Sequence, residues 1–543
     1  MSSADRELYA REALRYFPKL LGLVDRNPLS PTYGCFDRNY WHYKATDFPS
    51  GMAETGVLPL ALAHTHPFPG ADRYHQQPRL AELVVAGIRF AARSAHRDGS
   101  CDDYYPFERA LGATAFSLYA LTESCLLLGL QDPDLLAFLE RRGRWLLSHD
   151  EAGRLSNHQA LGALALYNVS LLTGEQEFQA GSAKRIDRLL GWQSSEGWFW
   201  EYEGADPGYQ TATIDFLAKC LSKSRDERLL EPLRHAVSFC QYFVHPDGSY
   251  GGAYGSRNTF HFFPAGFELL ADRIPEAAAI ASVFLEGLRH GKQAYAEDDR
   301  IFFHWVWDYL QAFLSCQRRA LPPAGFRNRT RHFPEARLYV REEPTRYAIS
   351  SLAKGGVLAL FEHGRRMYSD HGLIGELEDG RVVLTQLVDQ YEAHVGEEEI
   401  SVEGTFGYAS GWRPSPWRML LFRLALLTVG RFASDLLRRL LQRLLIVGKR
   451  EAPLHFRRTV RFGAEVTLID EVWLPPKARA RGLRLRSLYA GTDHTAIYTA
   501  TSRVFQESCL QPWNDYAPHL PALRSTGSLR VERRLGGVDQ IDR

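Results

Sequence analysis

A glycine turn, a short polar or aromatic stretch and an apolar helix follow one another four times between residues 98 and 257. The glycines of these turns are 54, 44 and 51 residues apart, and they are Gly99, Gly153, Gly197 and Gly248. A period of this size is typical of one supersecondary unit stacked on copies of itself, and each unit here has room for two helices. The repeat therefore predicts a toroid of helical hairpins with the glycine turns at one end.

The hydrophobic pattern within one repeat predicts an inner and an outer helix. Ser156 can cap a helix that runs to Thr173 and is apolar on every side, as expected of a helix covered all round. The segment 181–192 instead alternates charged and apolar residues, which favours a helix with one buried face. In a double-walled ring of such hairpins, the N-terminal ends of the inner helices face the axis.

The pattern changes after Leu321-Pro322-Pro323, which has the composition of a linker. Short alternating or β-branched segments bounded by turn residues predict strands at 336–341, 347–352, 356–362, 381–389, 454–462, 465–474 and 483–489. We therefore expect a multidomain α and β protein. An N-terminal (α/α) toroid at residues 1–320 is followed at 325–543 by an antiparallel β-sandwich domain with a helical insert.

The predicted insert, residues 415–448, is rich in leucine and arginine. It has six arginines against the single acid Asp435, and it lacks the run of about 18 apolar residues that a membrane-spanning helix requires. Three interpretations remain: a lid packed on the sheet, an amphipathic element on an anionic membrane surface, or an oligomer contact.

Composition narrows the range of partners. The formal charge of +1 offers no electrostatic reason to expect nucleic acid. Seven cysteines without C-x-x-C spacing suggest neither a disulfide framework nor a zinc site, and we expect no cofactor and no metal. The charged N-terminus lacks the apolar core of a secretory signal, which predicts a cytoplasmic protein, with peripheral attachment to the membrane if the insert lies on a lipid surface.

Polar residues at the start of each predicted inner helix would converge on one cavity. Asn157-His158 opens one such helix and Tyr209 opens the next, so an amide, an imidazole and a phenol are candidates for catalysis. Candidates for substrate binding include an arginine suited to a carboxylate; they are Arg257, Asn258, Tyr254, His261, Trp200, Glu108, Arg109 and Trp41. Each of these residues is also compatible with ordinary capping or packing.

Together these stretches resemble the heparinase II/III-like polysaccharide lyases, which pair a helical toroid with an antiparallel β-sandwich. The resemblance rests on Asn157-His158, Pro207-Gly208-Tyr209, residues 354–357 (KGGV) and Asp370-His371-Gly372. It implies that Asn157 neutralises a substrate carboxylate while His158 and Tyr209 serve as base and acid. Many relatives carry an H-x-H-x-D motif in the first strands of the sheet domain, and Asp370-His371 is the nearest remnant here.

The implied activity is β-elimination on an acidic, uronic-acid-containing polysaccharide, with abstraction of the C5 proton and loss of the 4-linked sugar. One alternative is a glycoside hydrolase on an (α/α) barrel, with carboxylates drawn from Asp102, Asp103, Glu108, Glu201, Glu203, Asp206 and Asp215. A second alternative is a non-catalytic glycan-binding protein of surface-polysaccharide assembly.

Overall fold

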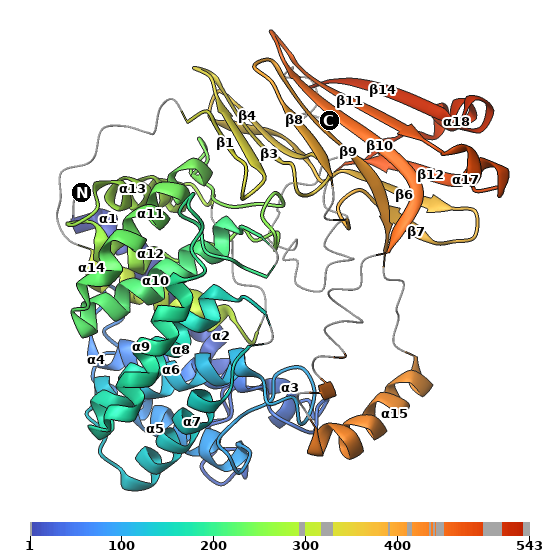
Figure 1. Ribbon diagram of the computed structural model, residues 1–543. Coiled ribbons are helices and arrows are strands. Elements are labelled where there is room, and N and C mark those ends of the chain that lie inside the picture. Colours follow the sequence, from blue (N-terminus) through green and yellow to red (C-terminus); the bar gives the residue numbers. More distant parts are fainter. Residues whose placement is uncertain are drawn as a thin grey trace.

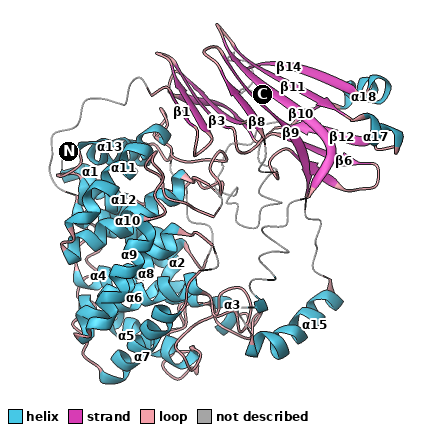
Figure 2. Ribbon diagram, in the orientation of Figure 1, coloured by secondary structure: helices cyan, strands magenta, loops and turns pink. Residues whose placement is uncertain are grey.

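The structure is a computed structural model that describes residues 3–151, 153–202, 204–292, 299–316, 329–388, 391–409, 415–433, 436–437, 440, 450–491 and 513–535. The helices of residues 3–316 form one body and the strands of residues 331–535 form another (Figures 1 and 2). The linker predicted at 321–323 lies outside the described residues.

The helical body is a closed double-walled ring. Its inner helices are α4 (Val57–Thr65), α6 (Leu111–Leu128), α8 (Ser156–Thr173), α10 (Pro207–Ser224), α12 (Pro264–Leu270) and α14 (Phe302–Ser315). Each packs on the next, and α14 packs against α4 to close the ring. The outer helices are α1 (Ser3–Leu14), α5 (Pro78–Ser94), α7 (Pro133–Ser148), α9 (Gln176–Leu190), α11 (Leu230–Cys240) and α13 (Pro275–Arg289). The predicted toroid of helical hairpins is confirmed.

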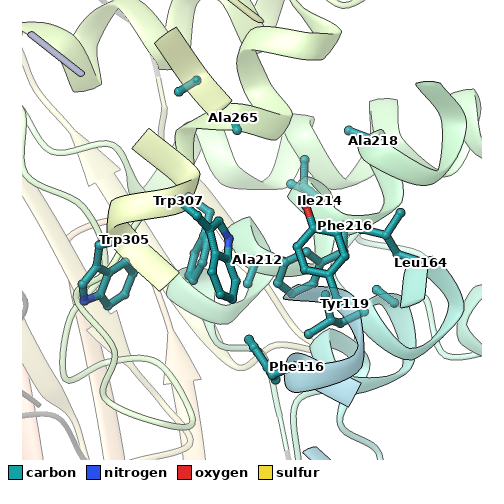
Figure 3. Close-up of a cluster of buried hydrophobic side chains, with 14 of the residues drawn as sticks. Phe116, Tyr119, Leu164, Ala212, Ile214, Phe216, Ala218, Ala265, Trp305 and Trp307 are labelled. Atoms are coloured by element: carbon teal, nitrogen blue, oxygen red, sulfur yellow. The ribbon is translucent and has the colours of Figure 1, made fainter. Parts of the chain in front are cut away.

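Burial follows the predicted division between the two walls. On α8 the alanines, leucines and valine from Ala160 to Val169 are fully buried, whereas α9 buries only one face. Figure 3 shows aromatic residues of α6, α10 and α14 meeting in the ring interior, among them Tyr119, Phe216 and Trp307. Within the described residues, α6 alone is long and apolar enough to cross a membrane, but 78% of it is buried inside the ring, as in a core helix of a soluble domain.

The glycine turns share one geometry in three of the four repeats. In each turn, the backbone N–H of the first residue donates to the carbonyl four residues later, and the glycine N–H donates back to the carbonyl of the first residue. In the first turn these residues are His96, Ser100 and Gly99. The equivalent pairs are Ser194–Trp198 with Gly197 and His245–Ser249 with Gly248. All three glycines have positive φ, and a Cβ at any of them would collide with the backbone of α7, α11 or α13. Each of these three turns fits tightly against an outer helix, and this fit requires glycine at the same place in each repeat.

Replacing Gly197 with Ala is expected to destabilise the toroid by roughly 2–4 kcal/mol. Its φ of +100° disfavours any side chain, and a Cβ would lie 2.3 Å from the carbonyl oxygen of His235. Gly22→Ala is the matched control, because Gly22 lies within α2 (Phe17–Leu23) and a Cβ there would meet nothing within 4 Å. Urea unfolding of the two variants measures the difference; equal stability would contradict the tight fit.

The strand body consists of two antiparallel sheets. The first has the order β1 (Arg331–Phe333), β2 (Leu338–Glu342), β3 (Arg346–Ser351), β4 (Val357–Glu362) and β5 (Arg365–Asp370). The second has the order β13 (Asn514–Asp515), β12 (Leu485–Ala490), β6 (Leu373–Leu377), β7 (Val382–Leu384), β9 (Glu399–Tyr408), β10 (Glu451–Phe462), β11 (Val466–Trp473) and β14 (Ser528–Leu535), with β8 (Glu392–Val395) paired to β9. This is the predicted β-sandwich.

The five-stranded sheet is buried on both faces. Alternate residues such as Tyr347 and Ile349 belong to the core shared with the toroid, whereas Ala348 and Leu360 belong to the core between the two sheets. Because strand side chains alternate between faces, one sheet can join the two bodies. The remaining described helices are short: α3 (Arg38–Trp41), α15 (Pro416–Ala425), α17 (Pro476–Ala480) and α18 (Leu520–Thr526).

Candidate active site

The N-terminal ends of α8 and α10 are joined by the loop that precedes α10. Leu155 pairs with Glu201 in an isolated bridge, and the Ser156 hydroxyl donates to the carbonyl of Trp200 at 2.6 Å. The prediction that Ser156 caps α8 is wrong: Leu155 holds the cap position, and Ser156 lies inside the helix. Its hydroxyl instead fixes the loop across the start of α8.

Asn157 is buried in the first turn of α8. Its Nδ2 donates to Oε2 of Glu201 at 2.9 Å, which orients the amide. A carboxamide nitrogen carries two hydrogens, so one N–H of Asn157 remains for another acceptor. Within the part of the chain that the structure describes, the Asn157 Oδ1 has no hydrogen-bond partner.

Glu201 is fully buried beside Asn157. Burial raises its pKa to about 7, although His158, Arg257 and the Asn157 amide partly oppose the shift. A carboxyl group with this pKa exchanges its proton near neutral pH, as groups at functional sites often do. The sequence indicates Glu201 only as one of several hydrolase carboxylates.

Replacing Glu201 with Gln is expected to stabilise the protein above neutral pH. A pKa raised from 4.5 to about 7 means that the folded state holds the proton more tightly than the unfolded state. Stability is then lost as the pH rises from about 4.5 to 7, by about 3 kcal/mol in total. Gln removes this loss, and its Oε1 can still accept from Asn157. Urea midpoints between about pH 5 and pH 8 should diverge, and parallel curves would contradict this.

His158 follows Asn157 and is half-buried at the inner end of the ring. Its Nδ1 lies 3.2 Å from Oε2 of Glu151, and its ring meets Phe116 edge-on at 6.0 Å. A Cβ at Gly112 would lie 2.5 Å from the His158 ring, so the start of α6 leaves room for the imidazole only because residue 112 is glycine. The carboxylate of Glu151 holds the ring in one orientation.

Tyr209 lies in the first turn of α10 and is half-buried. The Asp206 carboxylate caps this helix by accepting from the Tyr209 backbone N–H at 3.0 Å. The phenol ring meets the buried His261 ring edge-on at 4.8 Å, and His261 in turn lies 4.9 Å from Trp305 of α14. Tyr209, predicted to be catalytic, and His261, predicted to bind substrate, thus lie side by side among aromatic rings.

Arg257 lies between the Glu201 carboxyl group and the start of α10. Its guanidinium stacks 3.6 Å from the centre of the Tyr202 ring, and its backbone N–H donates to the Asp206 carboxylate at 2.8 Å. The positive charge also opposes the upward pKa shift of Glu201. Asn157 thus contacts Glu201 of the loop 200–209, and Asp206 of the same loop accepts from the backbone N–H groups of Arg257 and Tyr209.

Two predicted substrate-binding residues lie at the interface with the sheet domain. The Tyr254 hydroxyl is 2.9 Å from Nε2 of His245, and Oδ1 of Asn258 accepts from the Lys354 ammonium group. Lys354 also donates to two backbone carbonyls of the loop 253–255. Lys354 thus ties the sheet domain to the loop that carries Asn258, whereas the hydrogen bond of Tyr254 lies within the toroid.

The other predicted binding residues make local contacts. Glu108 accepts from two backbone N–H groups of its own loop, and Arg109 pairs with Asp98. Trp41 donates from Nε1 to the Leu23 carbonyl at 2.7 Å. Trp200 is half-buried with the Arg154 guanidinium 3.7 Å above its ring. Trp41 is the last residue of α3, and the other three lie in loops of the toroid.

One buried residue near the site has no sequence signal. His304 of α14 stacks on Phe116 at 4.4 Å, and His158 meets the same Phe116 ring edge-on at 6.0 Å. Because its helix is apolar and aromatic, the sequence alone suggests that this histidine belongs to the core. Its place near the site follows only from the closed ring, in which His304 of α14 meets Phe116 of α6.

Asp370 of the Asp370-His371 stretch belongs to a buried cluster of ion pairs. Asp370 is fully buried and pairs with Arg458 and Arg533, which also pair with Asp470 and so tie β5 to the second sheet. The two arginines lower the pKa of Asp370. Among the described residues, no three His, Cys, Asp or Glu side chains are grouped so as to hold a metal ion.

Comparison with solved structures places this arrangement among known folds. A chondroitin AC lyase from Streptomyces coelicolor A3, solved with chondroitin sulphate, aligns with 90% of this chain and 67% of its own at a TM-score of 0.53 and 10% identity. A heparinase III aligns with 86% of this chain and 70% of its own (TM-score 0.42, 11% identity). An unsaturated glucuronyl hydrolase from Bacillus sp. GL1 aligns with 49% and 84% (TM-score 0.35, 13% identity).

The chain therefore has the fold of the chondroitin AC lyase, a helical toroid followed by antiparallel sheets, as the resemblance implied. No protein-family model and no curated protein matches the sequence.

Proposed function

We propose that the protein is a polysaccharide lyase that cleaves a uronic-acid-containing polysaccharide by β-elimination. The observation that carries the proposal is the position of the Asn157 amide. The buried carboxyl group of Glu201 orients this amide at the start of α8, beside the start of α10, where the Tyr209 ring meets His261. The chondroitin AC lyase of the same fold was solved in complex with chondroitin sulphate, which supports an acidic glycan as the substrate class.

The reaction needs a group that neutralises the carboxylate, a base and an acid, and residues at or near the starts of α8 and α10 are the candidates for each. The free N–H of Asn157 and the Arg257 guanidinium would neutralise the uronate carboxylate, because the C5 proton is too weakly acidic otherwise. A base, His158 or Tyr209, removes that proton, and the electron pair forms the C4–C5 double bond. The C4–O4 bond breaks, and an acid returns a proton to O4 of the leaving sugar. No water is consumed.

Incubation with a panel of acidic polysaccharides tests the proposal. A lyase produces an unsaturated uronate at each new end, which absorbs ultraviolet light, and incorporates no oxygen from labelled water. Saturated ends that carry the label would identify a hydrolase, and binding without new ends would identify a glycan-binding protein.

One observation favours the hydrolase as the second candidate. A pKa of about 7 would suit Glu201 as a general acid. The reaction also needs a second carboxylate, and two candidates near α10 have structural roles: Asp206 caps the helix, and Asp215 is buried against Lys219 at 2.6 Å. The same product analysis decides between the two enzymes.

A further inference from the structure

Exposed apolar side chains are concentrated in one segment. Of 16 large hydrophobic residues that are exposed in the described chain, 10 lie between 417 and 440. Soluble domains rarely expose a contiguous apolar patch of this kind unless it meets a partner or a membrane. The segment contains α15 and the π-helical turn Leu426–Gly430 that continues it.

One stripe of this helix is docked on the toroid. Phe422 meets Tyr105 at 5.8 Å, Arg423 pairs with Asp47, and Leu426 is fully buried. Figure 1 shows α15 beside α3, away from the sheets. This placement contradicts the prediction of a lid packed on the sheet, because the described contacts of the insert are with the toroid.

The opposite stripe points to solvent. At 3.6 residues per turn, residues 417, 420, 421 and 424 share a face opposite the docked stripe of Phe422 and Leu426. Trp417, Leu420, Leu421 and Leu424 are each more than half exposed. We call these four residues the outward face.

The charge of the helix indicates what covers this face. Residues 415–433 contain Arg418, Arg423 and Arg431 and no acidic residue. Arg418 lies on one flank between the docked and outward stripes, where its long side chain can reach phosphate groups while the leucines enter the acyl boundary. Arg423 lies on the other flank, where it is paired with Asp47. A leucine-rich face with a tryptophan at its end and arginine flanks is typical of helices that lie in the plane of a membrane.

We propose that the outward face of α15 binds the surface of an anionic lipid membrane. A second copy of this chain is the competing occupant, but like-charged arginine flanks would then face each other across the contact. The docked stripe holds the helix against the loop before α6, so attachment would bring the end of the ring that carries His158 to the membrane. The proposal does not depend on the reaction that the site performs.

Sedimentation with lipid vesicles tests the proposal on the full chain. We expect the protein to sediment with vesicles of phosphatidylcholine and phosphatidylglycerol, more weakly with phosphatidylcholine alone, and less as salt is added. The triple variant Leu420→Ser, Leu421→Ser, Leu424→Ser should lower the partition coefficient on the order of a hundredfold. Arg418→Gln should lower it about fivefold.

A matched variant separates this effect from general loss of apolar surface. Leu29, Leu171 and Leu314 are exposed leucines elsewhere in the chain, and their replacement with Ser should leave vesicle binding unchanged. Because all six leucines are exposed, thermal unfolding should be the same for both triple variants. Absence of vesicle binding overturns the proposal, as does a concentration-dependent dimer in sedimentation velocity that only the α15 variant abolishes.

Discussion

Replacing Tyr209 with Phe is expected to reduce kcat by about 10²–10⁴-fold while the fold remains intact. Phe retains the ring that meets His261 at 4.8 Å and the backbone N–H that Asp206 caps. Only the hydroxyl is lost, and in the proposed reaction that hydroxyl transfers a proton to or from the sugar. Initial rates on the best substrate of the panel, at saturating concentration, measure the effect.

Tyr119→Phe is the control for the loss of a phenol group. Tyr119 is fully buried in the ring interior (Figure 3), and its hydroxyl accepts from Gln311 at 3.0 Å. This variant should lose about 1 kcal/mol of stability with little change in kcat. If Tyr209→Phe turned over substrate at a rate close to that of Tyr119→Phe, Tyr209 would have no part in proton transfer.

The toroid could be predicted because its repeat is visible in the chain. The tight glycine turns need glycine at 99, 197 and 248, and these positions set the period. Several strands could not be predicted. β5 (RRMYSD) has no β-branched residue and no regular alternation, and β9 and β14 have charged residues between their buried ones, so pairing with neighbouring strands is what places them in a sheet.

The candidate site was predictable only where local sequence determines it. Asn157 and Tyr209 occupy helix starts. Pro207 and the Asp206 cap mark the start of α10, whereas the apolar pattern of α8 places its start within one residue although Ser156 is not the cap. Glu201 is the residue that orients Asn157, and it reaches that position through a long-range bridge between Leu155 and Glu201. Tyr254 and Asn258 show why binding residues are hard to identify from sequence. A polar residue that bonds within the protein, as Tyr254 does to His245 and Asn258 to Lys354, has the same chemistry as one that binds a ligand.

Asn157→Ala should reduce kcat/KM by about 10²–10³-fold, which corresponds to roughly 2.7–4 kcal/mol of transition-state stabilisation. The negative charge that develops on the uronate carboxylate during proton removal is the charge that this amide would bind. Alanine removes the donor and leaves Glu201 without the hydrogen bond that now joins the two side chains at 2.9 Å. Stability should therefore fall as well.

Asn168→Ala separates the catalytic loss from the loss of stability. Asn168 lies on the same helix, is equally buried, and donates from Nδ2 to Oε2 of Glu123 at 2.8 Å, so it has the same amide-to-carboxylate contact further along α8. Both alanine variants should lose a similar 1–3 kcal/mol of stability, roughly the cost of a broken buried hydrogen bond. Only Asn157→Ala should lose activity. Equal rates in the two variants would mean that Asn157 serves the fold alone, since the start of α8 would then contribute no more to the reaction than its middle.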